Sequence, residues 1–150
     1  MTIELKGEAR EVALAEVQAT LAMARGDDMR ARLAELAAQL DAGAVDGDGE
    51  ELLESVLELG QQAGRIRAHY GPGGEQAAVA TLRRLPRGRE RAESARAVST
   101  ALQALVGRQL GAISIQAVGP GAFALQLEAD GVEAAVRLDQ TGARLASVGS

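Results

Sequence analysis

The spacing of apolar residues changes once along this chain, and that change divides it into two kinds of structure. Up to about residue 110, apolar side chains recur every three or four positions, which is the period of an amphipathic helix. After Gly111 they alternate with polar residues, which is the period of a strand with one buried face and one wet face. The pattern therefore predicts an α+β fold, with a helical part (1–110) followed by an antiparallel β-meander (111–150).

The helical part contains four to five amphipathic segments, which glycine, proline or acidic residues separate. Leucine stripes at helical spacing, N-cap residues and C-terminal glycines give their approximate bounds. The expected helices are residues 4–25, 27–40, 49–70, 75–85 and 89–109. The first two could instead form one long kinked helix, because a glycine inside a helix costs only about 1 kcal/mol. The pattern leaves this choice open.

The connections between these helices are also marked in the sequence. Residues 41–49 contain three glycines and three aspartates, a composition that favours turns, so we expect a loop there. Asp48 and Glu51 have the spacing of a capping box at the start of the next helix. Gly71-Pro72 and Pro86 are expected to end helices, because proline disfavours a helical backbone in the residue before it.

The β part is predicted to form a meander of three to four strands. Pro120-Gly121 has the composition of a type II turn, and Asp130-Gly131 that of a two-residue hairpin turn. Gln140-Thr141-Gly142 then turns the chain into a short last strand. Because each strand has one apolar face, we expect helix 89–109 to pack on that face. The result would be a single α+β domain of residues 1–150.

The composition agrees with a small globular protein. A chain of 150 residues can bury roughly 70% of its unfolded surface, which is enough for one domain with a core. Tyr70 and Phe123 are its only aromatic residues, so aliphatic side chains must fill that core. The absence of cysteine excludes disulfides and cysteine-ligated zinc, and it fits a reducing compartment. No apolar run suits a signal peptide or a membrane span, so we expect a cytoplasmic protein that does not enter membranes.

Charge is distributed unevenly along the chain. Residues 1–60 carry 14 acidic and 5 basic residues, whereas residues 61–110 carry 3 acidic and 9 basic ones. The densest basic stretch surrounds a predicted turn between two helices and contains Arg83, Arg84, Arg87, Arg89 and Arg91. Guanidinium groups in such a cluster can bind the phosphates of a nucleic acid. They can also bind carboxylates, either of a protein partner or of the acidic first 60 residues.

Few residues have the chemistry that catalysis needs. His69 is the only histidine, so one chain cannot assemble a histidine metal cluster. One hypothesis is a pocket around His69, Tyr70 and the glycine-rich turn at 71–74. The other is that His69 only stabilises the C-terminal end of its helix, where basic side chains interact favourably with the helix dipole. The acidic segment 46–51 lacks the ligand order of an EF-hand. We expect no catalytic residue, no cofactor and no metal site, and an enzyme is the least favoured class.

The favoured hypothesis is a noncatalytic protein-interaction or regulatory module that forms oligomers through amphipathic helices. Several leucine-striped helices exceed what one small sheet can cover, and twofold homodimers are the commonest oligomers. The predicted partner face follows the helix at 49–70 and consists of Leu52, Val56, Leu59, Ile66 and Tyr70. The alternative hypothesis is a protein associated with nucleic acid through the arginine cluster at 83–91.

Overall fold

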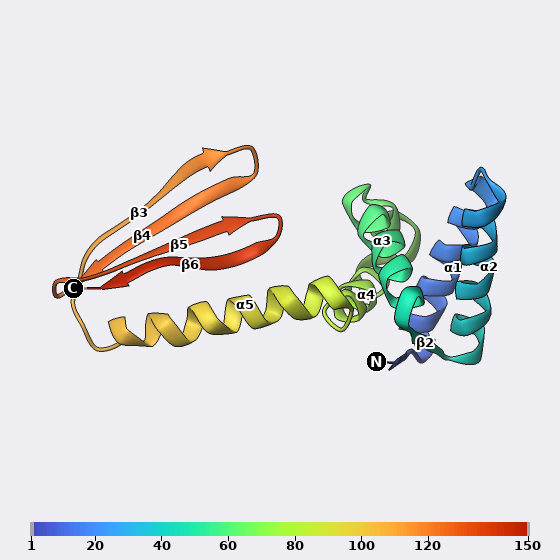
Figure 1. Ribbon diagram of the computed structural model, residues 1–150, viewed down its shortest axis with the longest axis horizontal. Coiled ribbons are helices and arrows are strands. Elements are labelled where there is room, and N and C mark those ends of the chain that lie inside the picture. The colour runs from blue at the N-terminus through green and yellow to red at the C-terminus, as the bar shows by residue number, and fades with distance from the viewer. Residues whose placement is uncertain (1, 150) are drawn as a thin grey trace. The chain divides into compact units, whose positions relative to one another are not determined.

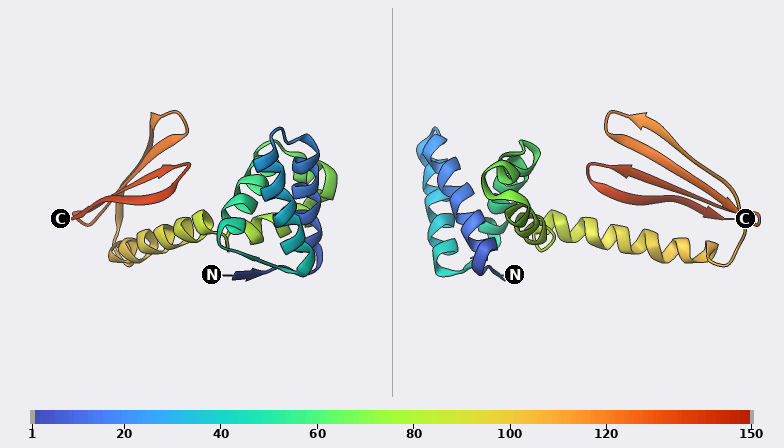
Figure 2. Two further views of the ribbon diagram at one scale, coloured as in Figure 1. Left: turned by 45° about the vertical axis from the view of Figure 1, so that its right-hand side comes forward. Right: turned by 180° about the vertical axis from the view of Figure 1, so that it is seen from behind.

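A computed structural model describes residues 2–149, in which helices precede an antiparallel sheet (Figure 1). This order confirms the predicted α+β fold. Contacts within the chain gather into two compact units, a helical unit that extends to Arg89 and a sheet unit that starts at Glu90. The single-domain organisation stays a prediction. Figure 2 gives two further views of the same elements.

The helical unit contains four complete helices and a small two-stranded sheet within its described residues. Its strands β1 and β2 are antiparallel, with Ile3 opposite Val45. A further helix, α5, begins in this unit and continues into the sheet unit. In chain order the elements are β1 (Thr2–Glu4), α1 (Gly7–Met23), α2 (Asp27–Ala42), β2 (Ala44–Asp46), α3 (Gly47–Gln62), α4 (Arg65–Leu82) and α5 (Pro86–Leu102).

Leucine, valine and isoleucine side chains from β1, β2 and helices α1 to α4, with Leu85 after α4, form one core in the helical unit. The largest of them are fully buried, among them Leu5, Leu33, Leu36, Leu40, Leu53, Leu57, Ile66 and Leu85. The contacts between α1 and each of α2, α3 and α4 hold this core together. Because burial of a leucine side chain stabilises a fold by about 1.5–3 kcal/mol, this cluster accounts for the stability of the unit.

The structure corrects two expected helix bounds and confirms a third. The helix expected at 49–70 is two helices, because the chain breaks at Gly64, whose φ of +71° is a left-handed conformation that glycine adopts without strain. The helix end expected at Gly71-Pro72 is confirmed, because the backbone of Gly71 is nonhelical, with a φ of +69°, and a separate helical segment of α4 follows from Pro72. Pro86 begins α5 instead of ending a helix, because the first helical position needs no backbone N–H.

Two local predictions in the 41–49 segment were also wrong. The segment contains β2 in place of a continuous loop, because Val45 pairs with Ile3 from the distant N-terminal end. The expected capping box does not form, since α3 begins at Gly47 with Asp46 as its N-cap and no side-chain capping bond. Strand pairing between distant segments and the exact start of a helix are both decided by tertiary contacts.

The sheet unit contains four antiparallel strands in the order of the chain, which confirms the predicted meander. Asp130 and Gly131 have φ values of +48° and +81°, and Gly121 has +66°, as the expected turns require. Helix α5 packs on β6, where Arg91 lies next to Gly142. The strands are β3 (Leu110–Gly119), β4 (Ala122–Ala129), β5 (Val132–Asp139) and β6 (Gly142–Gly149), after a short 3₁₀ turn at Gln103–Leu105.

We expect Leu57→Ala to lower the free energy of unfolding of the helical unit by about 2–5 kcal/mol, because Leu57 is 1% exposed in its core. The matched control is Leu59→Ala on the same helix, which should change stability by no more than about 0.5 kcal/mol, since Leu59 is 63% exposed. Urea denaturation followed by circular dichroism measures both values. Equal losses in the two variants would contradict the observed burial of α3.

The turn between β5 and β6 is fixed by the carboxylate of Asp139. Its Oδ1 accepts hydrogen bonds from the backbone N–H of Thr141 at 2.8 Å and from the Thr141 hydroxyl at 2.5 Å. These bonds, with a further one from Arg137, lower the pKa of Asp139 from 3.8 to about 2. Since the pKa is lowered on folding, the stabilisation is present above pH 4 or so and is lost as the pH falls toward about 2.

Titration of the Asp139 carboxyl carbon by NMR should therefore give a midpoint near pH 2. Thr141→Val removes the hydroxyl, which is the largest cause of the shift, while it keeps the shape of the side chain. We expect this variant to raise the midpoint toward 3.8. An unchanged midpoint would show that the hydroxyl does not contact Asp139 in solution.

Candidate functional site

The arginine cluster lies around the turn from α4 to α5, and two of its members bind glutamates of α3. The Nη2 atom of Arg87 lies 2.8 Å from Oε2 of Glu58, and that of Arg89 lies 3.4 Å from Oε2 of Glu50. The hydrogen bond with Glu58 raises the pKa of Arg87. These two arginines therefore neutralise carboxylates of their own chain.

The other three arginines of the cluster are placed differently. Arg83 and Arg84 are exposed, and the backbone carbonyl of Arg84 accepts a hydrogen bond from Arg89 at 2.9 Å. Arg91 lies in the sheet unit, where its side chain borders Gly142. A role for the cluster in binding nucleic acid or an acidic partner stays a prediction.

Glu54 explains why these arginines come close to α3. Its side chain is 0% exposed, and its two oxygens accept hydrogen bonds from the backbone N–H groups of Arg87 at 3.1 Å and Gly88 at 2.9 Å. These N–H groups belong to the first turn of α5, where helical hydrogen bonding leaves them unpaired and the helix dipole favours negative charge. Glu54 thus caps α5 from a neighbouring helix, and Arg87 balances its charge.

We expect Glu54→Gln to destabilise the helical unit by about 1–3 kcal/mol, because one oxygen acceptor of a buried charged pair is lost. Glu11→Gln is the matched control, since Glu11 is an exposed residue of α1 and its loss should have little effect. Thermal unfolding of both variants tests the cap. A Glu54→Gln protein as stable as the control would contradict it.

The predicted partner face on the helices does not lie on one surface. Val56 and Ile66 are fully buried in the core of the helical unit, whereas Leu59 is exposed. Leu52 and Tyr70 are half-buried. The five residues were expected on a single helix, but the break at Gly64 places Ile66 and Tyr70 on a second helix that packs against the first. Most of the predicted partner face therefore belongs to the core of the helical unit.

Tyr70 belongs to a buried polar cluster that sequence reasoning missed. The carboxylate of Glu16, 1% exposed on α1, lies 2.6 Å from Nη2 of Arg65. Burial raises the pKa of the Tyr70 hydroxyl, and the neighbouring Glu16 charge and hydrogen bond raise it further. Gly60 makes room for this cluster, because a Cβ there would lie 2.8 Å from Oε2 of Glu16. Glu16 stands between apolar residues in the sequence, so no local signal distinguished it.

The hypothesis of a pocket around His69 receives no support from the geometry. His69 is exposed, and its ring lies 6.2 Å from that of Tyr70. A cavity beside the bend at Gly71 is lined by Arg67, Pro72, Glu75, Gln76, Val79, Ala80 and Arg83. Neither His69 nor Tyr70 contributes to it. Arg67 and Glu75 already form an ion pair there at 3.5 Å.

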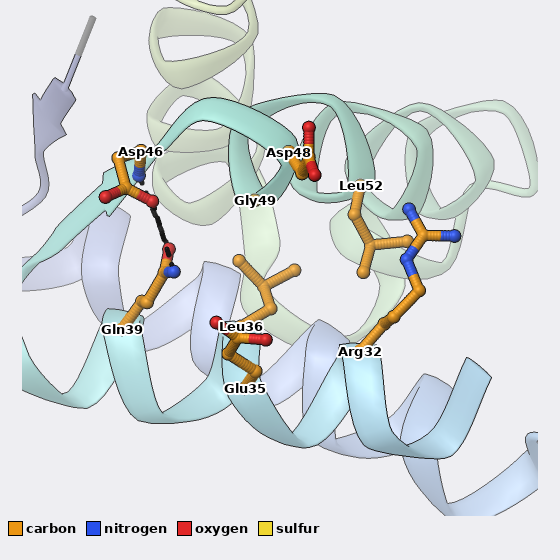
Figure 3. A pocket seen from close by; sticks show the side chains of 8 residues that line it. All are labelled: Arg32, Glu35, Leu36, Gln39, Asp46, Asp48, Gly49 and Leu52. Carbon is orange, nitrogen blue, oxygen red and sulfur yellow. Dashed lines mark hydrogen bonds between the residues drawn. The ribbon is translucent and has the colours of Figure 1, made fainter. Parts of the chain in front are cut away.

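A second cavity of about 210 Å³ lies between α2 and the start of α3 (Figure 3). At one end, Gln39 points toward Asp46, donating to its Oδ1 at 3.2 Å and accepting from its backbone N–H at 3.3 Å. Gln39 therefore fixes the N-cap residue of α3, which gives this part of the cavity a structural role. Within the described residues, no group of three or more acidic or histidine side chains could hold a metal ion.

The sheet unit offers a different kind of surface, because one face of its sheet is apolar across all four strands. The cross-strand register places these residues in three rows. The rows are Ile113–Leu127–Ala134–Val148, Ile115–Leu125–Val136–Leu145 and Ala117–Phe123–Leu138–Ala143. Ala134 and Val136 in the middle are buried, whereas Ile113 and Ile115 on β3 are each 60% exposed.

The sheet unit buries only small side chains. Among its described residues the buried hydrophobic ones are Val98, Ala122, Ala129, Ala134 and Val136, and no leucine, isoleucine or phenylalanine is among them. Helix α5 contributes only Val98, because most of its residues are arginine, glutamate, serine or alanine. The scarcity of large apolar residues in α5 is a sequence signal that this helix covers the sheet incompletely. We call the exposed apolar residues of the three rows the sheet surface: Ile113, Ile115, Phe123, Leu145 and Val148.

Comparison of the chain with protein-family models, with curated proteins and with solved structures finds no match. Among the described residues, no helix combines the length and the apolar character that crossing a membrane requires. Inference about function therefore rests on the surfaces and contacts of the chain itself.

Proposed function

We propose that this protein is a noncatalytic protein-interaction or regulatory module, and that the sheet surface is where it binds a protein partner. The observation that carries the proposal is the exposure of the apolar rows at β3, where Ile113 and Ile115 are 60% exposed on a sheet with little core of its own. An apolar patch of several neighbouring side chains is typical of protein-binding sites. This relocates the interaction from the helices, where the sequence placed it, to the sheet.

The energetics of burial support the proposal. Apolar area removed from water contributes about 25 cal/mol per Å², so a partner that covers the five side chains of the sheet surface gains several kcal/mol. A flat face without charges suits a protein partner with an apolar surface of its own, because no buried charge must be paired. Phe123, the more exposed of the two aromatic residues, lies in this surface and is suited to fill a pocket in the partner.

The alternative, association with nucleic acid, has less support. Arg87 and Arg89 would have to exchange Glu58 and Glu50 for phosphates, which would leave a buried Glu50 without its cation. The net charge of −5 also opposes binding to a polyanion.

The test is recovery of partners by the tagged full-length protein, with and without nuclease. We expect Ile115→Asp to reduce recovery of a specific protein roughly tenfold or more, because it places a charge at one of the two most exposed side chains of the sheet surface. Leu59→Asp is the matched control, since it introduces the same charge at an exposed leucine of the helical unit and should leave recovery unchanged. Circular dichroism checks that both variants are folded.

Two results would contradict the proposal. In one, both variants retain the same protein partners as the unmodified chain. In the other, the recovered material is nucleic acid that disappears on nuclease treatment and on reversal of charge at Arg87 and Arg89, which would favour the alternative hypothesis.

A further inference from the structure

Strand β3 forms one edge of the four-stranded sheet and leaves a row of backbone groups without strand partners. β4 pairs with one side of β3, and no strand within residues 2–149 pairs with the other side. Natural proteins protect such edges with charged residues, proline or a covering element. The ten residues Leu110–Gly119 include no charged residue and no proline, and all of them are exposed. An edge of this kind is a template for another strand.

The opposite edge strand, β6, is exposed over residues 144–149 but differs from β3 at its start. β6 carries Arg144, whose guanidinium hydrogen-bonds to the Thr141 hydroxyl. Helix α5 packs on β6, and Figure 1 shows the two elements next to each other, with β3 at the far edge of the sheet. Because β6 carries a charged residue and β3 carries none, β3 is the edge better suited to pairing with another strand.

We infer that β3 pairs with β3 of a second copy of this chain, antiparallel and about a twofold axis, so that two sheets become one of eight strands. The inference rests on the proposed function and adds a partner at the edge of the same surface. Antiparallel pairing of a strand with its own copy is reciprocal, as a twofold interface requires. It also satisfies the backbone N–H and C=O groups along the edge.

The residue pattern of β3 is complementary to itself. When the twofold axis passes through a residue of β3, the two residues that lie opposite each other across the seam have numbers that differ by an even amount. Residues an even number apart point to the same face of a sheet, so the apolar face of one copy continues into the apolar face of the other. With Ser114 on the axis, Ile113 lies opposite Ile115 of the second copy, and Ala112 lies opposite Gln116. Pairs of β-branched residues directly opposite each other stabilise antiparallel strands. No like charges meet, because β3 has none.

The area of the sheet surface gives a reason for this pairing. Five side chains that are 39–60% exposed present on the order of 400 Å² of apolar area in one copy, whereas a stable interface buries about 800 Å² per partner. Two copies joined at β3 place their sheet surfaces side by side on the same face. The pair therefore presents an area of the size that a stable protein partner covers, which a single copy does not.

Single cysteines test the pairing and its register, because the chain has no cysteine of its own. Directly opposite residues in antiparallel strands have Cα atoms about 4.5–5.5 Å apart, which suits a disulfide. Ser114→Cys should form a covalent dimer under mild oxidation. Gln126→Cys is the matched control, since Gln126 lies opposite Ser114 on the inner strand β4 and should cross-link roughly tenfold less.

Sedimentation of the full chain over a concentration series provides the second measurement. The unmodified chain should sediment as a dimer, and the double variant Ser114→Lys with Gln116→Lys should sediment as a monomer, because it places like charges across the new edge. Gln126→Lys should remain a dimer. A monomeric unmodified chain, or equal cross-linking of the two cysteine variants, would overturn the inference.

The inference and the proposed function fail in different experiments. If the chain is monomeric but Ile115→Asp still loses a specific protein partner, the pairing of β3 is excluded and the proposed function stands. If Ser114→Cys cross-links as expected but no protein partner depends on Ile115, the pairing is supported and the binding function of the sheet surface is not.

Discussion

The sheet unit has an apolar face larger than its own residues cover, and the proposed function depends on this mismatch. Three apolar rows cross the four strands, yet α5 contributes only Val98 as a buried side chain. A small unit that buries mainly alanine and valine gains little from the hydrophobic effect, which is the dominant favourable term in folding. The same uncovered area becomes a source of binding energy once another protein surface reaches it.

The helical unit differs from the sheet unit because it buries charged side chains. Glu16, Glu50 and Glu54 are each buried, and each meets an arginine from a later part of the chain. Removing one partner of such a pair costs more than the pair contributes, because the remaining charge stays in a place of low polarity. Arg87 and Arg89, two of the five arginines of the cluster, therefore serve the fold. The apolar face of the sheet, whose three rows contain no charged residue, is the surface that we propose for recognition.

Local patterns were sufficient for much of the fold and insufficient for the site. The change from helical to alternating spacing near Gly111 located the boundary between helices and strands, and Asp130-Gly131 located a hairpin turn. The same reasoning wrongly placed Gly64 inside a helix and wrongly predicted that Pro86 ends a helix. Glycine occurs both within helices and at their ends, and proline occurs both after a helix and at its first position, so neither residue type fixes a helix bound. The partner face at 49–70 was wrong for the same reason, since it assumed an unbroken helix.

By itself, the sequence determined that a helical part precedes an antiparallel meander, and it determined the turns of that meander. Spacing and turn composition act over a few residues, so they can be interpreted without knowledge of distant contacts. Only the tertiary structure decided which apolar residues are buried, since Ile66 in the core and Ile115 at the surface are the same residue type. It also decided that Glu54 caps α5, a contact across 33 positions of the chain. Burial and charge pairing depend on which elements pack together, and no local pattern specifies that.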